Sequence, residues 1–283
     1  MKTGLVLEGG AMRGMFTAGI LDAMMENNIT VDGAIGVSAG ATFGCNFKSK
    51  QIGRTIRYNM KYSKDPRYAG IRSLIKTGDF YGADFCYHQL PEKLDLFDVE
   101  TYQDNPMDFY AVTTDVNTGK PIYHLCPNGD SKDIEWFRAS ASMPLVSNIV
   151  KIDGYEMLDG GISDPIPIRK FMEMGYEKNI IVLTQHDGYE KKKSGILPLL
   201  KIKMKRKYPN LYHDMEIRHE MYNKTLADIK GLEKDGKVYV IRPKNPITIS
   251  RTENDPAKLK ALYDIGYKEG LEHIAGIETF LNK

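Results

Sequence analysis

Residues 36–40, with the sequence GVSAG, combine a hydroxyl nucleophile with the small neighbours that acyl transfer requires. The segment stands between a stretch typical of a strand and one typical of a helix. In such a turn the serine hydroxyl projects beyond the strand, and glycines flank it because larger side chains would clash. The helix that follows directs its N-terminal amides toward developing negative charge. We predict that Ser38 is a nucleophile in an elbow completed by Gly36 and Gly40.

Residues 8–14, with the sequence EGGAMRG, form a second candidate segment. A glycine-rich turn between a strand and a helix presents free backbone N–H groups that can hold an anion. A P-loop would need Gly-Lys and then Ser or Thr, but Met15 follows Gly14, and the dinucleotide pattern would need a glycine in place of Ala11. We predict an oxyanion site for acyl transfer; close strand-to-helix packing is the alternative.

Asp159, followed by two glycines, is the third candidate. Asp153-Gly154 predicts a tight hairpin, and the second strand of that hairpin delivers Asp159 at its end. A carboxylate there could accept the proton of Ser38, provided that burial raises its pKa above the ordinary value of about 3.9. Taken alone, Asp-Gly-Gly is typical of a turn.

A histidine could compete for the role of base in a serine-histidine-acid triad. The chain has four histidines after Asp159, but none stands in a local signature; they are His186, His213, His219 and His273. In addition, the elbow follows only the second predicted strand. We therefore expect a mechanism without histidine, without a metal and without a cofactor.

Alternating apolar runs and helical stretches predict an α/β fold: a mostly parallel central sheet sandwiched by helices in three layers. The expected strands are residues 5–8, 31–37, 109–116, 121–125, 148–152, 155–158, 179–184 and 237–242. The expected helices are residues 11–25, 39–48, several pieces within 58–97, 133–141, 164–174, 211–233 and a last one opened by Asp255-Pro256.

Bulk properties exclude several classes of protein. A formal net charge of +2 on 283 residues gives no field that would attract nucleic acid. No signal peptide is apparent, and the apolar runs are far shorter than the roughly 20 residues of a membrane span. Three widely spaced cysteines form neither a disulfide framework nor a metal motif. We expect a cytoplasmic protein, either free or peripheral at a membrane.

The three segments, in this order and spacing, resemble the signatures of the patatin-like phospholipase family. Residues 139–144, ASASMP, are similar to the family's A-S-x-x-x-P stretch. The resemblance covers residues 4–170 as the catalytic core, within a single domain 1–283 whose part 171–283 continues the sheet and helices. It implies a patatin-like three-layer fold, a serine hydrolase cleaving acyl esters of lipids, and a Ser38–Asp159 dyad.

The resemblance also assigns roles within the glycine-rich turn. It implies that the amides of Gly9, Gly10 and Ala11 form the oxyanion hole, supported by Arg13 and Gly14. The sequence departs from the commonest family pattern at Glu8, where aspartate is usual, and at Ala11, where glycine is usual. Alanine supplies the same amide but restricts φ.

A basic run from Lys191 to Lys207 surrounds a short apolar segment. It is either a solvated loop or a flap that docks on anionic lipid at the edge of the sheet where Ser38 lies. Two other functions stay open: a lipid- or anion-binding regulatory protein with little turnover, and acyl transfer to an acceptor other than water. The lipid head group is not indicated.

Overall fold

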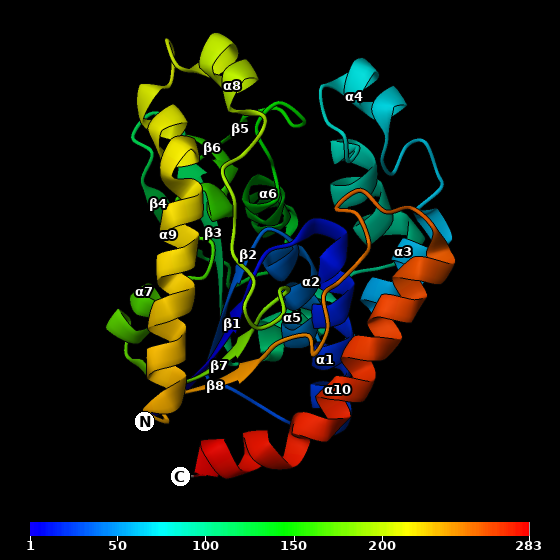
Figure 1. Cartoon of the computed structure of the whole chain (residues 1–283). Helices are drawn as coiled ribbons and strands as arrows, with labels where there is room; N and C mark the ends of the chain where they lie inside the picture. The colour runs from blue at the N-terminus through cyan, green and yellow to red at the C-terminus, as the bar shows by residue number, and fades with distance from the viewer. Residues whose placement is uncertain (283) are drawn as a thin grey trace.

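The computed structural model describes residues 1–282, in which eight strands form one sheet in the order β5-β6-β3-β2-β1-β7-β8, with β4 paired to β3 (Figure 1). The strands are β1 (Lys2–Leu7), β2 (Gly33–Val37), β3 (Asp108–Asp115), β4 (Pro121–Leu125), β5 (Val150–Ile152), β6 (Tyr155–Asp159), β7 (Tyr176–Val182) and β8 (Val238–Ile241).

The helices separate these strands. They are α1 (Gly14–Glu26), α2 (Ala39–Lys48), α3 (Arg54–Tyr62), α4 (Ile71–Thr77), α5 (Val99–Asp104), α6 (Ser131–Ser140), α7 (Ile168–Glu173), α8 (Leu197–Met204), α9 (Pro209–Lys234) and α10 (Pro256–Asn282). Short 3₁₀ turns, η1 (Ala11–Arg13) and η3 (Gly160–Ile162), and a π-helical segment, η2 (Phe85–Leu94), complete the elements.

The centre of the sheet is parallel and one side is antiparallel. β1 pairs in parallel with β2 and β7, and β2–β3 and β7–β8 are parallel as well. β3 pairs antiparallel with β4 and β6, and β5 with β6. The predicted α/β class, with a mostly parallel sheet flanked by helices, is confirmed. The carboxyl ends of β1 and β2 therefore meet at one edge of the sheet, where ligands of open α/β sheets bind.

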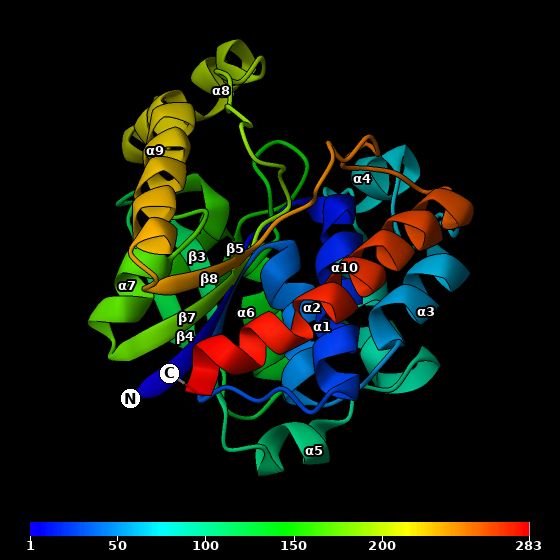
Figure 2. The same cartoon turned by 60° about the horizontal axis from the view of Figure 1, so that its bottom comes forward.

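Helices cover both faces of the sheet, because alternate strand residues point to opposite sides. Leu5 and Leu7 of β1 join a core shared with α1, α2, α6 and α10. Val6 joins a second core shared with α7 and α9. Figures 1 and 2 show the sheet between α9 on one side and α1 with α10 on the other.

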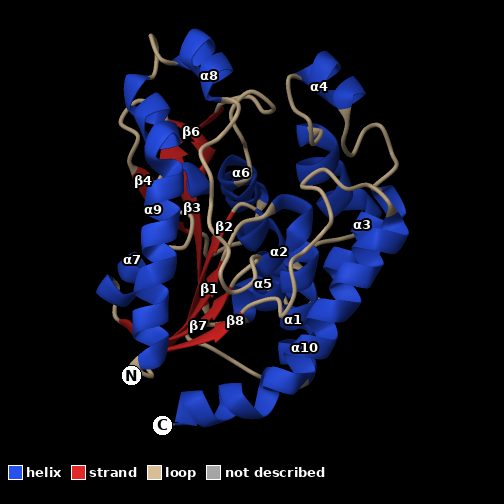
Figure 3. Cartoon of the chain, in the orientation of Figure 1, coloured by secondary structure: helices blue, strands red, loops and turns tan. Residues whose placement is uncertain are grey.

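The observed helices differ from the expected ones at α7 and α8. α7 begins at Ile168 rather than at residue 164, because Pro165 and Pro167 disfavour a helical conformation in the residue that precedes each of them. The basic run holds a helix, α8, where we expected a loop or flap, and Figure 3 shows α8 and α4 as separate short helices near one end of the molecule. Within residues 1–282, no helix is long and apolar enough to span a membrane.

Candidate active site

Ser38 lies in a sharp turn between β2 and α2, as predicted. Its backbone has φ 55° and ψ −120°, a conformation that a side chain makes unfavourable and that is found at nucleophile elbows. A Cβ atom on Gly36 would lie 2.4 Å from the carbonyl oxygen of Gly40, and one on Gly40 would lie 2.3 Å from that of Leu7. Only glycine fits at these two positions, so the elbow sequence follows from backbone packing.

Ser140, the last residue of α6, fixes the elbow from outside. The Ser38 backbone N–H donates to Ser140 Oγ at 2.8 Å, and the Ser140 hydroxyl donates to the Val112 carbonyl at 2.6 Å. The Ser140 side chain is fully buried. The ASASMP segment, noted in the sequence without a role for its serines, thus anchors the turn.

Asp159 ends β6, which is antiparallel to β3, and its side chain is only 2% exposed. Its backbone N–H donates to the Ser142 carbonyl at 2.8 Å, and its Oδ1 accepts the Gly161 N–H at 2.7 Å. Burial raises the pKa of this carboxyl, while the neighbouring Ser38 side chain and the positive charge of Arg218 act to lower it. The structure thus brings Asp159 to Ser38 and moves its pKa in the direction that a base requires.

The glycine-rich turn is tied to its surroundings through Glu8. This buried carboxylate accepts hydrogen bonds from the Thr184 N–H and the Tyr222 hydroxyl, both at 2.6 Å. Thr184 also donates through its hydroxyl to the Gly9 carbonyl at 3.0 Å. Glu8 therefore joins the turn to the end of β7 and to α9.

Three consecutive amides of the turn stay free. Among residues 1–282, no acceptor receives the N–H of Gly9, Gly10 or Ala11, whereas the Met12 N–H donates to the Arg251 carbonyl at 3.3 Å. Ala11 has φ 50°, the left-handed conformation that a glycine adopts without strain. The departure at Ala11 therefore costs backbone strain but keeps the amide. A Cβ on Gly9 would lie 2.8 Å from the Ser38 Cβ, so the turn lies directly against the nucleophile.

Arg13 and Gly14 connect this turn to α1. The Arg13 guanidinium faces the side-chain amide of Gln185, just beyond β7. Burial lowers the pKa of Arg13, and the neighbouring Arg251 lowers it further, while Glu8 opposes them. Gly14 begins the helix, with its backbone close to Ala39 and Phe43 of α2.

Two cationic residues that sequence analysis did not identify, Arg218 and Arg251, also lie here, together with Lys191, the first residue of the basic run. Arg218, on α9, donates through Nε to the Gly161 carbonyl, and its charge acts on the pKa of Asp159. Arg251 lies between β8 and α10, and Lys191 lies between β7 and α8. The distance of Arg218 and Arg251 along the chain from the motifs leaves no spacing pattern that could have revealed them.

An apolar cavity of about 560 Å³ opens at Ser38. Its lining includes Ser38, Ala11 and Arg251, together with the side chains of Tyr58, Leu90 and Phe137. No histidine lines it within the described chain, and His273, for instance, bonds to Tyr239 instead. A cavity of this size and character accommodates a hydrocarbon chain.

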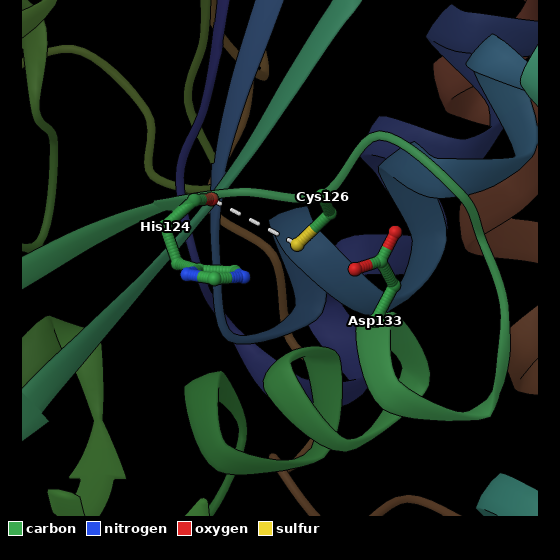
Figure 4. A group of neighbouring side chains, drawn as sticks. All are labelled: His124, Cys126 and Asp133. Atoms are coloured by element: carbon green, nitrogen blue, oxygen red, sulfur yellow. Dashed lines mark hydrogen bonds between the residues drawn. The ribbon is translucent and has the colours of Figure 1, made fainter. Parts of the chain in front are cut away.

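A separate cluster combines His124, Cys126 and Asp133, whose potential ligand atoms lie within 4.8 Å of one another (Figure 4). The Asp133 carboxylate already accepts the N–H groups of Asn128 and Gly129 at 2.7 Å. The His124 ring stacks on Trp136 at 3.8 Å, and burial raises the pKa of the Cys126 thiol well above its ordinary value. These contacts account for the three side chains without a cation.

The mostly parallel sheet, the elbow at the carboxyl end of β2 and the facing glycine-rich turn define an α/β protein with a nucleophile elbow. The family model described as "Patatin-like phospholipase" matches residues 5–172, more than half of the sequence. The chain belongs to the patatin-like phospholipase family, and the resemblance drawn from the motifs is confirmed. A second model, "Domain of unknown function (DUF6363)", matches residues 208–282.

Similar proteins share this family at low identity. The chain is 29% identical over 189 residues to "Uncharacterized protein YjjU" of Escherichia coli K12, covering 65% of this chain and 52% of that protein. It is 25% identical to "Patatin-like phospholipase domain-containing protein ZK370.4" of Caenorhabditis elegans, covering 95% of this chain and 20% of that protein. It is 26% identical to "Lysophospholipase nte1" of Aspergillus terreus, covering 62% and 11%.

The chain therefore spans about half the length of the bacterial relative and a fifth or less of these two eukaryotic ones. Among solved structures, VipD from Legionella pneumophila aligns with a TM-score of 0.46 and 12% identity, covering 97% of this chain and 67% of that chain. Family membership supports lipid hydrolysis at the level of the family.

Proposed function

We propose that this protein is a serine acyl hydrolase, a lipid esterase or phospholipase, with Ser38 as nucleophile and Asp159 as base. The observation that carries the proposal is the position of Ser38, held in a strained elbow, close enough to the buried Asp159 carboxyl to affect its raised pKa. The free amides of Gly9, Gly10 and Ala11, which lie against Ser38, support an oxyanion hole.

The proposed reaction has two halves. Ser38 Oγ attacks the ester carbonyl as Asp159 takes the hydroxyl proton. The carbonyl oxygen becomes an oxyanion that accepts hydrogen bonds from the free amides. Collapse of this intermediate breaks the bond to the leaving alcohol, which takes the proton from Asp159. Water then attacks the acyl-enzyme and loses a proton to Asp159. The bond between the acyl carbon and Ser38 Oγ breaks, the carboxylic acid leaves, and Asp159 returns the proton to Ser38. The apolar cavity receives the acyl chain.

Turnover of a short-chain p-nitrophenyl ester tests this proposal. The Ser38→Ala and Asp159→Asn variants should each lose at least about 10²-fold in kcat, because each removes a group that the first step needs. The matched control is Ser131→Ala, since Ser131 is exposed at the start of α6 and does not line the cavity. Lipid binding by a wild-type protein without turnover would instead favour a regulatory protein of the same fold.

We further propose that the helices α4 and α8 dock on an anionic lipid surface. Ile71 and Ile75 of α4 are 71% and 79% exposed, and Ile202 of α8 is 81% exposed. Ile196 and Leu199 join the exposed α8 surface to the lining of the cavity. Figures 1 and 2 both show α4 and α8 on either side of one end of the molecule.

Exposed cations on and after α8 give this surface its charge: Lys201, Lys203, Lys205, Arg206 and Lys207. Apolar side chains among cations suit an anionic bilayer. The variant Ile202→Glu should bind less to phosphatidylserine vesicles in a sedimentation assay, whereas Ile265→Glu on α10 should bind as the wild type does. Equal binding by both variants would contradict this docking surface.

A further inference from the structure

The active site carries more positive than negative charge. Four cations, Arg13, Lys191, Arg218 and Arg251, surround the two carboxylates of Glu8 and Asp159 closely enough to affect one another's pKa values. Within residues 1–282, none of the four forms an ion pair within 4.0 Å.

Several arginines elsewhere on the molecule do form ion pairs. Arg57, Arg67 and Arg169 each meet a carboxylate oxygen at 2.6–2.7 Å, although each is largely exposed to solvent. Half-buried cations need partners more than exposed ones do, because burial removes the stabilisation that water provides. Arg13, Lys191 and Arg218 are half-buried, whereas Arg251 is exposed. The three half-buried cations therefore favour the binding of an anion that this chain does not itself supply.

Lys191 is turned inward, unlike its neighbours in the basic run. Its backbone N–H donates to Asn223 Oδ1 at 2.8 Å, the Asn223 side chain donates back to its carbonyl at 3.0 Å, and its ammonium lies 4.2 Å from the centre of the Tyr222 ring. Burial, together with the charges of Arg218 and Arg251, lowers the pKa of Lys191 to about 7. An anion among these groups would stabilise the charged lysine.

Arg251 connects these cations to the acyl cavity. It lines the cavity together with Ser38, and its carbonyl accepts hydrogen bonds from the Met12 N–H and the Tyr81 hydroxyl, both at 3.3 Å. The loop from β7 to α8, which carries Lys191, and the loop from β8 to α10, which carries Arg251, leave the same edge of the sheet from neighbouring parallel strands (Figures 1 and 2). When an acyl chain occupies the cavity, the alcohol portion of the ester therefore lies beside these cations.

We propose that Lys191, Arg218 and Arg251 form an anion-binding subsite that holds a phosphate group of the lipid substrate next to the scissile ester. Lysine and arginine side chains in this arrangement suit the oxygens of a phosphate. Arg218 and Arg251 both lie within residues 208–282, so the region of unknown function supplies two of the three cations. The choice of a lipid ligand rests on the proposed hydrolase activity.

Binding to the Ser38→Ala protein tests the subsite without chemistry. Calorimetric titration would compare dodecyl phosphate with 1-monolauroylglycerol, which has the same chain length but no phosphate, and with inorganic phosphate. Adding Lys191→Gln or Arg251→Gln should weaken dodecyl phosphate binding by about tenfold each, as loss of a charge-assisted hydrogen bond does. Binding of the glycerol ester should change by less than about twofold.

Matched controls are Lys192→Gln and Arg169→Gln, whose side chains are exposed and lie outside both the subsite and the proposed docking surface. Unchanged dodecyl phosphate binding in the subsite variants, an equal loss for the glycerol ester, or an equal loss in the controls would each overturn the proposal. Inorganic phosphate that binds as tightly as dodecyl phosphate would assign the cations to a free anion and overturn it too. Because the titration needs no nucleophile, a failed hydrolase assay leaves this result interpretable.

Discussion

Replacing Arg218 with glutamine should shift the acid limb of the kcat/KM profile to higher pH. Asp159 must be ionised to accept the Ser38 proton, so activity falls as the pH decreases through its pKa. Burial raises that pKa, and the positive charge of Arg218 opposes the effect of burial. Without the charge the pKa of Asp159 rises further, and the protonated, inactive form persists to higher pH.

The size of the effect on stability follows from the contacts of Arg218. Its Nε donates to the Gly161 carbonyl, and Gly161 also donates its N–H to Asp159. Loss of one charge-assisted hydrogen bond should lower the free energy of unfolding by about 1.5–3 kcal/mol. Less firm positioning of Asp159 should lower kcat/KM at pH 7 by about 10- to 100-fold, which corresponds to about 1.4–2.7 kcal/mol.

The assay uses a neutral p-nitrophenyl ester, so that the phosphate subsite plays no part. Arg218→Lys keeps the charge and should restore most of the pH profile without restoring the full rate, since lysine lacks the planar fork of donors. Arg169→Gln is the matched control. Arg169 lies on α7 and pairs on the surface with Asp228 of α9, the helix that carries Arg218. A rate and pH profile unchanged by Arg218→Gln would refute this reasoning, and a loss of stability alone would make Arg218 purely structural.

Three further changes have defined outcomes. Ser140→Ala leaves the Ser38 N–H without its acceptor and should lower the free energy of unfolding in urea by about 1–3 kcal/mol, together with kcat. Ala11→Gly removes a left-handed alanine and should keep at least wild-type turnover of the ester, whereas Ala11→Val should lose it. Burial raises the pKa of Asp22 from 3.8 to about 6, so its contribution to stability is full below pH 3.8 and is lost as the pH rises through 6. Asp22→Asn can still accept hydrogen bonds from the Gly53 N–H and the Tyr263 hydroxyl. Urea unfolding at several pH values should show that this variant loses up to about 3 kcal/mol less unfolding free energy across the range than the wild type does.

Local patterns predicted much of the fold because they depend on neighbouring residues. The helix expected at residues 39–48 is α2, and the Asp153-Gly154 turn has positive φ at both positions, as its hairpin requires. The start of α7 was wrong because the two prolines of its first turn outweigh the capping signal of Asp164. α8 was not expected, since lysines and apolar residues alternate there without a clear amphipathic pattern.

The site was predictable only where its residues lie in local motifs. Ser38, Asp159 and the glycine-rich turn are close together because three turns at strand ends meet at one edge of the sheet. Arg218 and Arg251 reach that edge through the packing of α9 and of the loop after β8, which no local spacing encodes. The basic run was expected at this edge, but the sequence did not indicate that Lys191 is held there by Asn223. Long-range packing of polar side chains is therefore the part that required the structure.

The central claim concerns Ser38, and covalent labelling tests it most directly. A fluorophosphonate should modify a single serine, and peptide mapping by mass spectrometry should place the label on Ser38. Asp159→Asn should slow the labelling strongly, because the hydroxyl loses its base, while the fold persists. Labelling of another serine, or labelling at Ser38 that is equally fast without the carboxylate, would contradict the proposed mechanism.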